Sequence, residues 1–276
     1  MRALFWAELF KLCKQRRTYY ALGAILVMEI IILFSAYYQG RSFIDLLLTN
    51  FKETFYFEGN LLNGNLLVYV ILNTLWFHLP LLLMIIISGL LTAEYKDGTL
   101  QTVFLQPVHK LKFIACKYLA AILFTLVSVL FLMITAFGLS YLIFGQGDLI
   151  VYLDTFNFYE PHDAFHRLIW AFFSGSVTMV FYTVVSLTMA ICFKDATITW
   201  IVAAFFLIVS SLLIRIDYGD SLFGKVLYAK LGESWQYFFH FEIPWQPIII
   251  NNGLLIVYSI LVMALGMLIF TKNDIS

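Results

Sequence analysis

Six long apolar runs dominate the pattern of hydrophobic and polar positions along the chain. A membrane helix needs about 20 mostly apolar residues to cross ~30 Å of hydrocarbon, and each run meets this requirement. Barrel strands would alternate apolar and polar residues, which these runs do not, so helices must satisfy the backbone. The predicted transmembrane helices are residues 19–38, 66–91, 119–144, 168–193, 197–216 and 248–270.

The composition indicates the same class of protein. Apolar residues make up 62% of the 276 positions and charged residues 12%, against about 45–50% and about 25% in soluble domains. The 17 Lys and Arg residues balance 17 Asp and Glu residues, so no basic excess is present to bind nucleic acid. We therefore expect an all-α integral membrane protein, with residues 1–276 forming one transmembrane domain in the lipid bilayer.

The charges between the spans predict the orientation, because cytoplasmic flanks are enriched in Lys and Arg. With the N-terminus inside, eleven basic and five acidic residues fall on the inner side. Six basic and eleven acidic residues then fall on the outer side. Both termini are therefore expected in the cytoplasm, and the compact size favours the cytoplasmic (inner) membrane of a bacterium.

Residues 1–17 precede the first span and are amphipathic when written as a helix. The apolar face carries Phe5, Trp6, Leu9, Phe10, Leu12 and Cys13, and the polar face carries Glu8, Lys11, Lys14 and Gln15. This pattern is typical of an interface helix in the headgroup plane, with its polar face toward water. The alternative is a topology signal alone, in which Lys14, Arg16 and Arg17 hold the N-terminus inside.

The connection between the second and third spans, residues 92–118, has the most specific pattern. Gly98 and Pro107 each break a helix, and one short amphipathic element, residues 99–106, lies between them. A short helix that projects from the membrane is well shaped to fit a groove on a soluble partner. The alternative is an ordinary positively charged connector.

This connection resembles the corresponding loop of ABC-2-type transporter permeases. The similarity comprises Glu94, then Gly98-Thr99-Leu100, then Pro107 with Lys110 three residues on, and then Lys117 opening the third helix. The sequence departs from many members at Val108-His109, where they have a small residue or Ser. The six spans, the amphipathic N-terminus and the outer segment 217–247 are also similar to that family in architecture.

The resemblance implies the permease subunit of an ABC transporter, which forms an export or extrusion pathway and does not hydrolyse ATP itself. Two such subunits, identical or different, would dock two ABC ATPase subunits, and ATP and Mg²⁺ would bind to those. A periplasmic or extracellular partner is left open, as is the substrate. Coupling to the ATPase is implied for Glu94, Gly98, Thr99, Leu100, Pro107 and Lys110, and for Phe5, Trp6, Glu8, Leu9, Lys11 and Lys14 of the interface helix.

The outer segment 217–247 is rich in aromatic residues, which favour the membrane interface. The resemblance implies short helices that enter the outer leaflet and return, and a surface loop with an aromatic belt is the alternative. Residues 219–225 read G-x-x-x-x-G-K, but Val226 follows where a phosphate loop has Ser or Thr, and no strand precedes it. We expect no nucleotide there, so the energy source should be another chain.

Polar residues inside the spans are candidates for a transport pathway, because an ionisable group at membrane depth is costly. These candidates are Glu29, Asn73 and His78. Glu29 either faces a central pathway or hydrogen-bonds a neighbouring helix in its neutral form, and the sequence leaves both open. In the outer loop 145–167, His162 and His166 share a helix face, but two ligands are too few for a closed metal site. We assign no metal to this pair.

Two other functions compete with the permease interpretation. A self-sufficient secondary transporter would normally show internal repeats, and we find no convincing repeat between residues 1–138 and 139–276. A membrane enzyme would need a convergent catalytic set, and no hydrolase signature occurs in the sequence. A structural membrane anchor is the remaining alternative.

Overall fold

A computed structural model describes residues 2–48, 61–153, 155–219 and 221–272. Six of the helices in these ranges are long and apolar enough to cross a membrane, which confirms the predicted fold class. The elements in chain order are α1 (Arg2–Lys14), α2 (Arg16–Leu48), α3 (Gly64–Lys96), α4 (Thr99–Phe104), α5 (Lys110–Phe144), β1 (Leu149–Tyr152), β2 (Phe156–Tyr159), α6 (Pro161–Phe193), α7 (Ala196–Arg215), α8 (Leu222–Val226), α9 (Tyr228–Leu231), the 3₁₀ helix η1 (Gly232–Phe239) and α10 (Trp245–Lys272).

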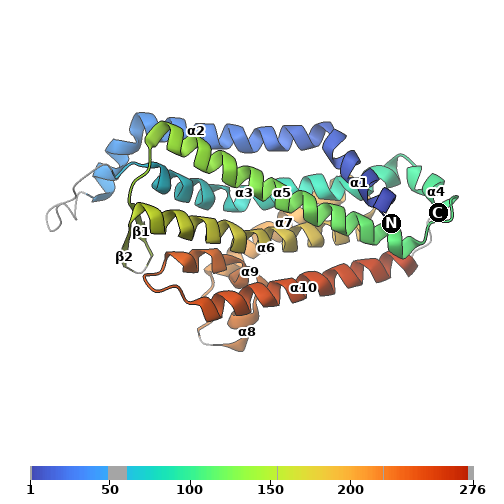
Figure 1. The fold of residues 1–276 in the computed structure, drawn as a ribbon. Helices are drawn as coiled ribbons and strands as arrows, with labels where there is room; N and C mark the ends of the chain where they lie inside the picture. Colours follow the sequence, from blue (N-terminus) through green and yellow to red (C-terminus); the bar gives the residue numbers. More distant parts are fainter. Residues whose placement is uncertain (1, 49–60, 154, 220, 273–276) are drawn as a thin grey trace.

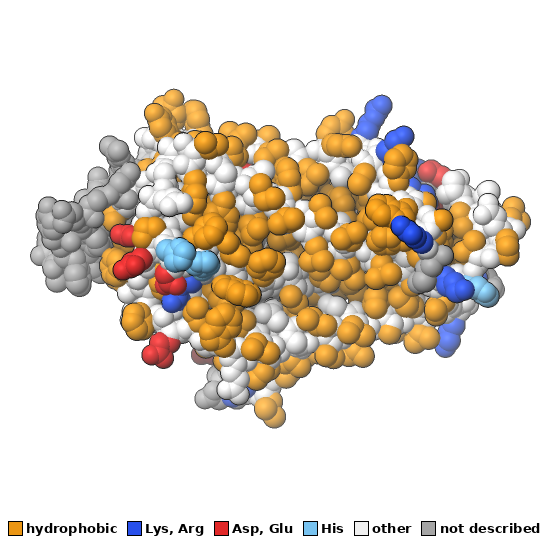
Figure 2. Space-filling view, viewed as in Figure 1, with side chains coloured by type: hydrophobic (Ala, Val, Ile, Leu, Met, Phe, Trp, Pro, Cys, Tyr) orange, Lys and Arg blue, Asp and Glu red, His pale blue; other side chains and the backbone are white. Residues whose placement is uncertain are grey.

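The long helices run side by side as one bundle with two chemically different ends (Figure 1). One end carries α1, α4 and the last turn of α10, and the other carries the β1–β2 hairpin. Lys and Arg side chains gather at the first end, which we call the basic end, and Asp and Glu side chains gather mainly at the other, the acidic end (Figure 2). The surface between the ends is largely apolar, as a bilayer requires.

Local sequence sets the ends of several helices. Asn63 and Asp195 cap α3 and α7 by accepting bonds from the backbone N–H groups of Leu66 at 3.1 Å and Ile198 at 2.8 Å. Pro161 occupies the first turn of α6, where its missing N–H has no partner to lose. Most of the helices are longer than the predicted spans, because turns beyond the hydrocarbon remain helical in water.

The connection between the second and third spans differs from the predicted bounds on both sides. The segment 92–118 was expected to be a connection, but α3 extends to Lys96 and α5 begins at Lys110. Within this segment only residues 97–98 and 105–109 are not helical. The short element expected at 99–106 is confirmed as α4, which ends at Phe104.

Helix α6 lies at the centre of the bundle. In its most apolar stretch 67% of the residues are buried, against 22% in each of α2, α7 and α10. Gly175 on α6 permits close packing against α3, because a Cβ atom there would lie 2.6 Å from the ring of Trp76. The three outer helices therefore present most of their apolar surface to lipid or to another subunit.

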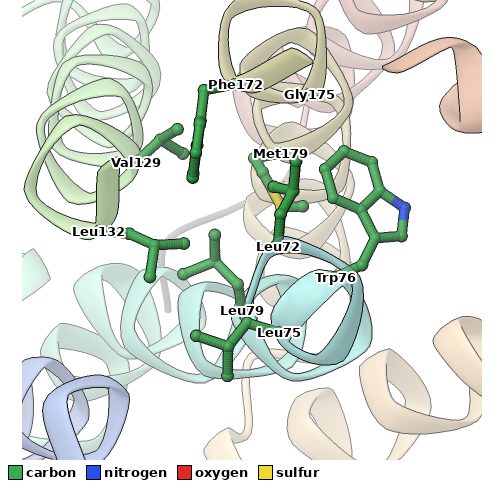
Figure 3. Close-up of a pocket in the computed structure, with 9 residues that line it drawn as sticks. All are labelled: Leu72, Leu75, Trp76, Leu79, Val129, Leu132, Phe172, Gly175 and Met179. Atoms are coloured by element: carbon green, nitrogen blue, oxygen red, sulfur yellow. The ribbon is translucent and has the colours of Figure 1, made fainter. Parts of the chain in front are cut away.

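Apolar side chains fill the space between α3, α5 and α6. Figure 3 shows Leu75 and Leu79 from α3, Val129 and Leu132 from α5, and Phe172 from α6 pointing into this space. The remaining cavity is about 10 Å³, roughly the space that a single water needs. This part of one copy is therefore a packed core.

At the acidic end, the chain between α5 and α6 forms a hairpin that the sequence does not predict. β1 pairs with β2 in antiparallel register, with Leu149 opposite Tyr159 and Tyr152 opposite Phe156. The β-branched and aromatic residues of this stretch are typical of strands. The hairpin packs on the outer segment, where the Tyr159 hydroxyl donates to the carbonyl of Phe239 at 2.6 Å.

The outer segment 217–247 folds into the short helices α8, α9 and η1, as expected. It reaches deep along the bundle, since the Thr178 hydroxyl, midway along α6, donates to the carbonyl of Gly232 at 3.2 Å. Trp235 is buried, with its ring centre 4.8 Å from that of Trp76. These contacts hold η1 against the middle of α3 and α6.

Arg167, in the second turn of α6, fixes the end of η1. Its guanidinium donates to the carbonyls of Phe238 and His240 at 2.8 Å each and of Phe241 at 3.3 Å. It also donates to Asp163 at 2.8 Å and lies 4.3 Å from the ring centre of Tyr159. One cation therefore binds the backbone of the outer segment to α6 and to the hairpin.

We predict that Arg167→Ala loosens the outer segment. The substitution leaves three carbonyls without their charged donor, which should cost on the order of 2–3 kcal/mol. Thermal unfolding in detergent should begin several degrees lower, and limited proteolysis should cut within 217–247 sooner. Arg215→Ala, at the exposed end of α7, is the control. Equal unfolding and cleavage of the two variants would contradict the proposed role of Arg167.

Candidate functional site

Four charged side chains from three helices meet at the basic end, and we call them the ion cluster. Glu8 and Lys11 come from α1, Glu94 from the end of α3, and Lys117 from α5. The Nζ atom of Lys117 lies 2.7 Å from Oε2 of Glu8 and 3.0 Å from Oε2 of Glu94. The Nζ atom of Lys11 lies 2.9 Å from Oε1 of Glu8 and 2.6 Å from Oε1 of Glu94. Each lysine therefore bridges both carboxylates.

The ion cluster is largely removed from water. The side chains of Lys117 and Glu8 are 0% and 1% exposed. Lys117 also donates to the carbonyl of Leu90 at 3.1 Å, so three oxygens surround an ammonium that has three hydrogens. The cluster carries no net charge. Removing one member leaves an unpaired charge in the interior, which typically costs about 3–5 kcal/mol.

Lys11 lies at the edge of the cluster and keeps its charge. Burial lowers the pKa of Lys11, but the hydrogen bonds to Glu94 and Glu8 outweigh burial, and the pKa is raised above its usual 10.5. Because the pKa is higher in the folded state, the stabilisation from Lys11 is fully present at neutral pH. It is lost only as the pH rises from the usual lysine value through the raised one.

The local sequence of α1 explains how a charged residue reaches the interior. Glu8 and Lys11 are three residues apart and share one face of the helix. Leu12, one turn after Glu8, is fully buried on the same side. The Thr18 hydroxyl donates to the carbonyl of Leu12 at 2.7 Å, which closes the turn into α2. The face of α1 that contacts the bundle is therefore half ionic and half apolar.

The short helix α4 projects at the basic end between α3 and α5 (Figure 1). Gly98 precedes it with a φ of 66°, a left-handed conformation that glycine adopts at little cost. Leu100 is buried, and the ring centre of Phe104 lies 5.2 Å from that of Phe113, so one face of α4 is fixed to the bundle. Leu105, just after the helix, is 87% exposed.

The residues predicted to couple to the ATPase are not all exposed in the structure. Glu94 lies within α3 in the ion cluster and Leu100 is the buried residue of α4, so neither presents its side chain to a partner. Gly98 shapes the turn. The members with exposed or partly exposed side chains are Thr99, Pro107 and Lys110. Lys117 does not open its helix as expected, because α5 begins two turns earlier, at Lys110.

Two features of this site are missed by sequence reasoning. One is the exposed Leu105, for which the only signal is a leucine directly before the helix-breaking Gln106-Pro107. The other is the pairing of Glu8 with Lys117, for which the signal is a single acid on an otherwise basic helix. Hydrophobic periodicity cannot find this pairing, because it treats every charged residue as facing water.

The orientation expected for the interface helix needs correction. Glu8 was placed on the water-facing side with Lys11 and Lys14, but it is buried against Lys117. An oppositely charged partner inside the bundle offsets the loss of water. Phe5 and Leu9 are partly buried. Trp6 and Phe10 are 60% and 59% exposed, and Lys14 Nζ lies 4.7 Å from the ring centre of Phe10.

The three candidates for a transport pathway do not meet in one site. Glu29 is buried and accepts a bond of 2.8 Å from the Thr135 hydroxyl of α5 on Oε1, so it faces a neighbouring helix. Its Oε2 atom has no hydrogen-bond partner among the described residues. Asn73 and His78 are exposed on α3, where each contacts a carbonyl of its own helix.

His162 and His166 lie together at the acidic end, with 3.1 Å between their Nε2 atoms. Both side chains are exposed in the first turns of α6. Within the described residues, no group of three or more His, Cys, Asp or Glu side chains could hold a metal ion. The pair therefore offers two possible ligands, and the two imidazole rings are hydrogen-bonded to each other.

Comparison of the sequence with known protein families gives one match. A family model described as ABC-2 family transporter protein matches residues 4–211, about three quarters of the chain. The matched part contains the whole ion cluster and α4. No curated protein matches the chain.

We predict a characteristic pattern of stability for variants of the ion cluster. Lys117→Met leaves two carboxylates with only Lys11, so the free energy of unfolding should fall by about 3–5 kcal/mol. Adding Glu8→Gln to Lys117→Met restores neutrality, so this double variant should be more stable than Lys117→Met alone. Thermal unfolding in detergent measures both.

Lys112→Met is the matched control, because Lys112 is exposed on the same helix. It should unfold like the unmodified protein. The ion cluster would have no such role if Lys117→Met also unfolded like the unmodified protein, or if Glu8→Gln added a further full loss to it.

Proposed function

The chain belongs to the ABC-2 family of transporter proteins, and from that premise we propose that it is the permease subunit of an ABC transporter. In this proposal it forms the membrane pathway through which a substrate is exported or extruded. A separate ATPase subunit binds ATP and Mg²⁺ and hydrolyses the ATP. The chain itself is not catalytic.

The exposed tip of α4 beside the ion cluster is the observation that supports this proposal best. Leu105 is a large apolar side chain at the basic end, outside the spans, and it is 87% exposed. An apolar side chain held out from the bundle in this way fits a groove on a soluble partner. The buried Leu100 and the packed Phe104 fix the tip in place. The ATPase is therefore proposed to dock on α4 and on the adjacent part of α1.

The ion cluster supplies the proposed path of coupling. Each lysine holds one carboxylate of α1 and one of α3, and Lys117 itself belongs to α5. A rigid unit of α1, α4 and the inner ends of α3 and α5 would follow the ATPase when it closes. The three helices would then shift together, because separating them exposes charges that have no other partners.

The transport pathway is proposed to lie between two permease subunits. The space between α3, α5 and α6 of one copy is packed (Figure 3). Asn73 and His78 lie on an exposed face of α3, a helix that contacts both α2 and α7. These two helices are mostly exposed within one copy. Two permease subunits and two ATPase subunits would complete the transporter, and the apolar spans favour a hydrophobic or amphipathic substrate.

The charge distribution supports an orientation in the membrane. Basic side chains gather at the end that carries α1 and α4 (Figure 2), and such an excess favours the cytoplasmic side. We place that end and both termini in the cytoplasm, in the inner membrane of a bacterium. The ATPase would then meet α4 where ATP is present.

The docking proposal predicts that Leu105→Asp removes the ATPase. A tagged permease, expressed with its native partners and purified in mild detergent, should bring down an ATP-hydrolysing subunit. Leu105→Asp should lose this subunit while the permease keeps its own thermal stability, because the side chain is exposed. The measurement is ATPase activity and subunit ratio in the eluate.

Leu222→Asp is the matched control, because Leu222 is 81% exposed on α8, in the outer segment and away from α4. It should retain the ATPase at the level of the unmodified protein. Equal retention by Leu105→Asp would show that the tip of α4 is not the docking site. An unmodified permease that elutes alone, and that transports in vesicles without ATP, would overturn the permease proposal in favour of a secondary transporter.

A further inference from the structure

Two apolar cavities adjoin along the side of α5. The first, of about 450 Å³, opens between α1 and α5 and is lined by Arg2, Phe5, Cys116, Leu119, Ile122, Leu123 and Leu126. The second, of about 240 Å³, lies between α5, α6 and α10. Ile122 and Leu126 belong to both. The two cavities therefore meet at these two side chains, and we call them together the α5 groove.

The walls of the α5 groove are suited to a hydrocarbon chain. In the first cavity every lining residue except Arg2 is apolar or a cysteine. In the second, the hydroxyls of Ser176 and Ser259 already donate to carbonyls of their own helices, so they need no ligand. Both cavities are large beside the ~30 Å³ that one water occupies in the liquid. A chain of methylene groups fits this space better than ordered water.

The length of the groove matches one leaflet of a bilayer. Cys116 and Leu126 are ten residues apart on α5, which is roughly 15 Å along the helix axis. Half of the ~30 Å hydrocarbon thickness is the same distance. A chain that enters near Cys116 would therefore end close to the middle of the membrane, where the second cavity lies.

Cations stand at the open end of the groove. Arg2 lines the first cavity directly. Lys112 lies one helical turn before Cys116, on the side of α5 that continues through Leu119 and Leu123. Both side chains are exposed, and within the described part of the chain neither forms an ion pair. The groove thus has a positive entrance and an apolar interior.

We propose that the α5 groove binds one anionic phospholipid from the leaflet at the basic end. The phosphate group lies between Arg2 and Lys112, and one acyl chain follows α5 into the space between α5, α6 and α10. Basic pockets beside transmembrane helices are known to select anionic headgroups. A segment of a soluble protein would have to enter the hydrocarbon to reach the second cavity, which a lipid chain does without cost.

Lipid binding to the delipidated protein, measured by native mass spectrometry in detergent, tests this proposal. Phosphatidylglycerol and phosphatidylcholine with identical acyl chains are the probes. The unmodified protein should bind one phosphatidylglycerol more tightly than phosphatidylcholine. Arg2→Gln with Lys112→Gln should weaken phosphatidylglycerol binding by about fivefold for each charge removed, and weaken phosphatidylcholine binding less, because the choline cation already offsets the attraction of its phosphate.

Two further variants separate the headgroup from the chain. Lys96→Gln with Lys272→Gln removes two exposed cations from the same end but outside the groove, and it should retain the preference for phosphatidylglycerol. Leu123→Trp fills the first cavity and should weaken both lipids. Because Leu123 is 40% exposed, this substitution should leave the thermal stability intact.

Three results would overturn the proposal. One is equal binding of both lipids by the unmodified protein. Another is an equal loss of phosphatidylglycerol binding in the two charge variants, which would indicate a diffuse basic surface. The last is a dimer that binds no lipid and that Leu123→Trp converts to monomers, because a second copy of the chain would then occupy the groove.

Discussion

The burial of Lys117 is the constraint on which the basic end of this structure depends. An ammonium group without water costs several kcal/mol unless carboxylates surround it. Glu8 and Glu94 supply that charge from α1 and α3. The interface helix therefore cannot lie freely on the membrane, because leaving the bundle would strand a cation. Since Glu94 comes four residues before Gly98, fixing Glu94 also sets the place where the chain turns into α4.

At the acidic end, too, a largely buried cation holds separate segments together, but its partners are mostly backbone carbonyls. Arg167 meets one carboxylate and three backbone carbonyls, so it holds a segment by its backbone and needs no particular side chains from it. Carbonyls at the end of a helix lack intrahelical donors, and the guanidinium provides them. Between the two charged ends the helices pack mainly through apolar contacts and through close approaches such as that of Gly175 to Trp76. Each end is thus specified by electrostatics and the middle by shape.

Sequence reasoning predicts the fold well and the site in part, for identifiable reasons. The lack of hydrogen-bond partners in lipid makes the six spans predictable from composition. Helix α4 is predictable from the breakers Gly98 and Pro107 on either side of it. The hairpin at Leu149–Tyr159 is missed because four-residue strands are weak signals beside long apolar runs. Glu8 is misplaced because its partner is 109 residues away, and no local pattern carries that distance. The direction of Glu29 likewise depends on Thr135, which lies on another helix.

Helix α1 joins the two proposals, because one side of it bears Glu8 and another side bears Arg2 and Phe5 of the α5 groove. If α1 moved against α5 during transport, the groove would change shape and its lipid would resist or assist each cycle. The ion cluster opposes that movement, since Glu8 and Lys117 join these same two helices. The groove should then keep its shape throughout, and a bound lipid acts as a fixed filler between α1 and α5. Its contribution would be to the stability of the coupling unit and not to the direction of its movement.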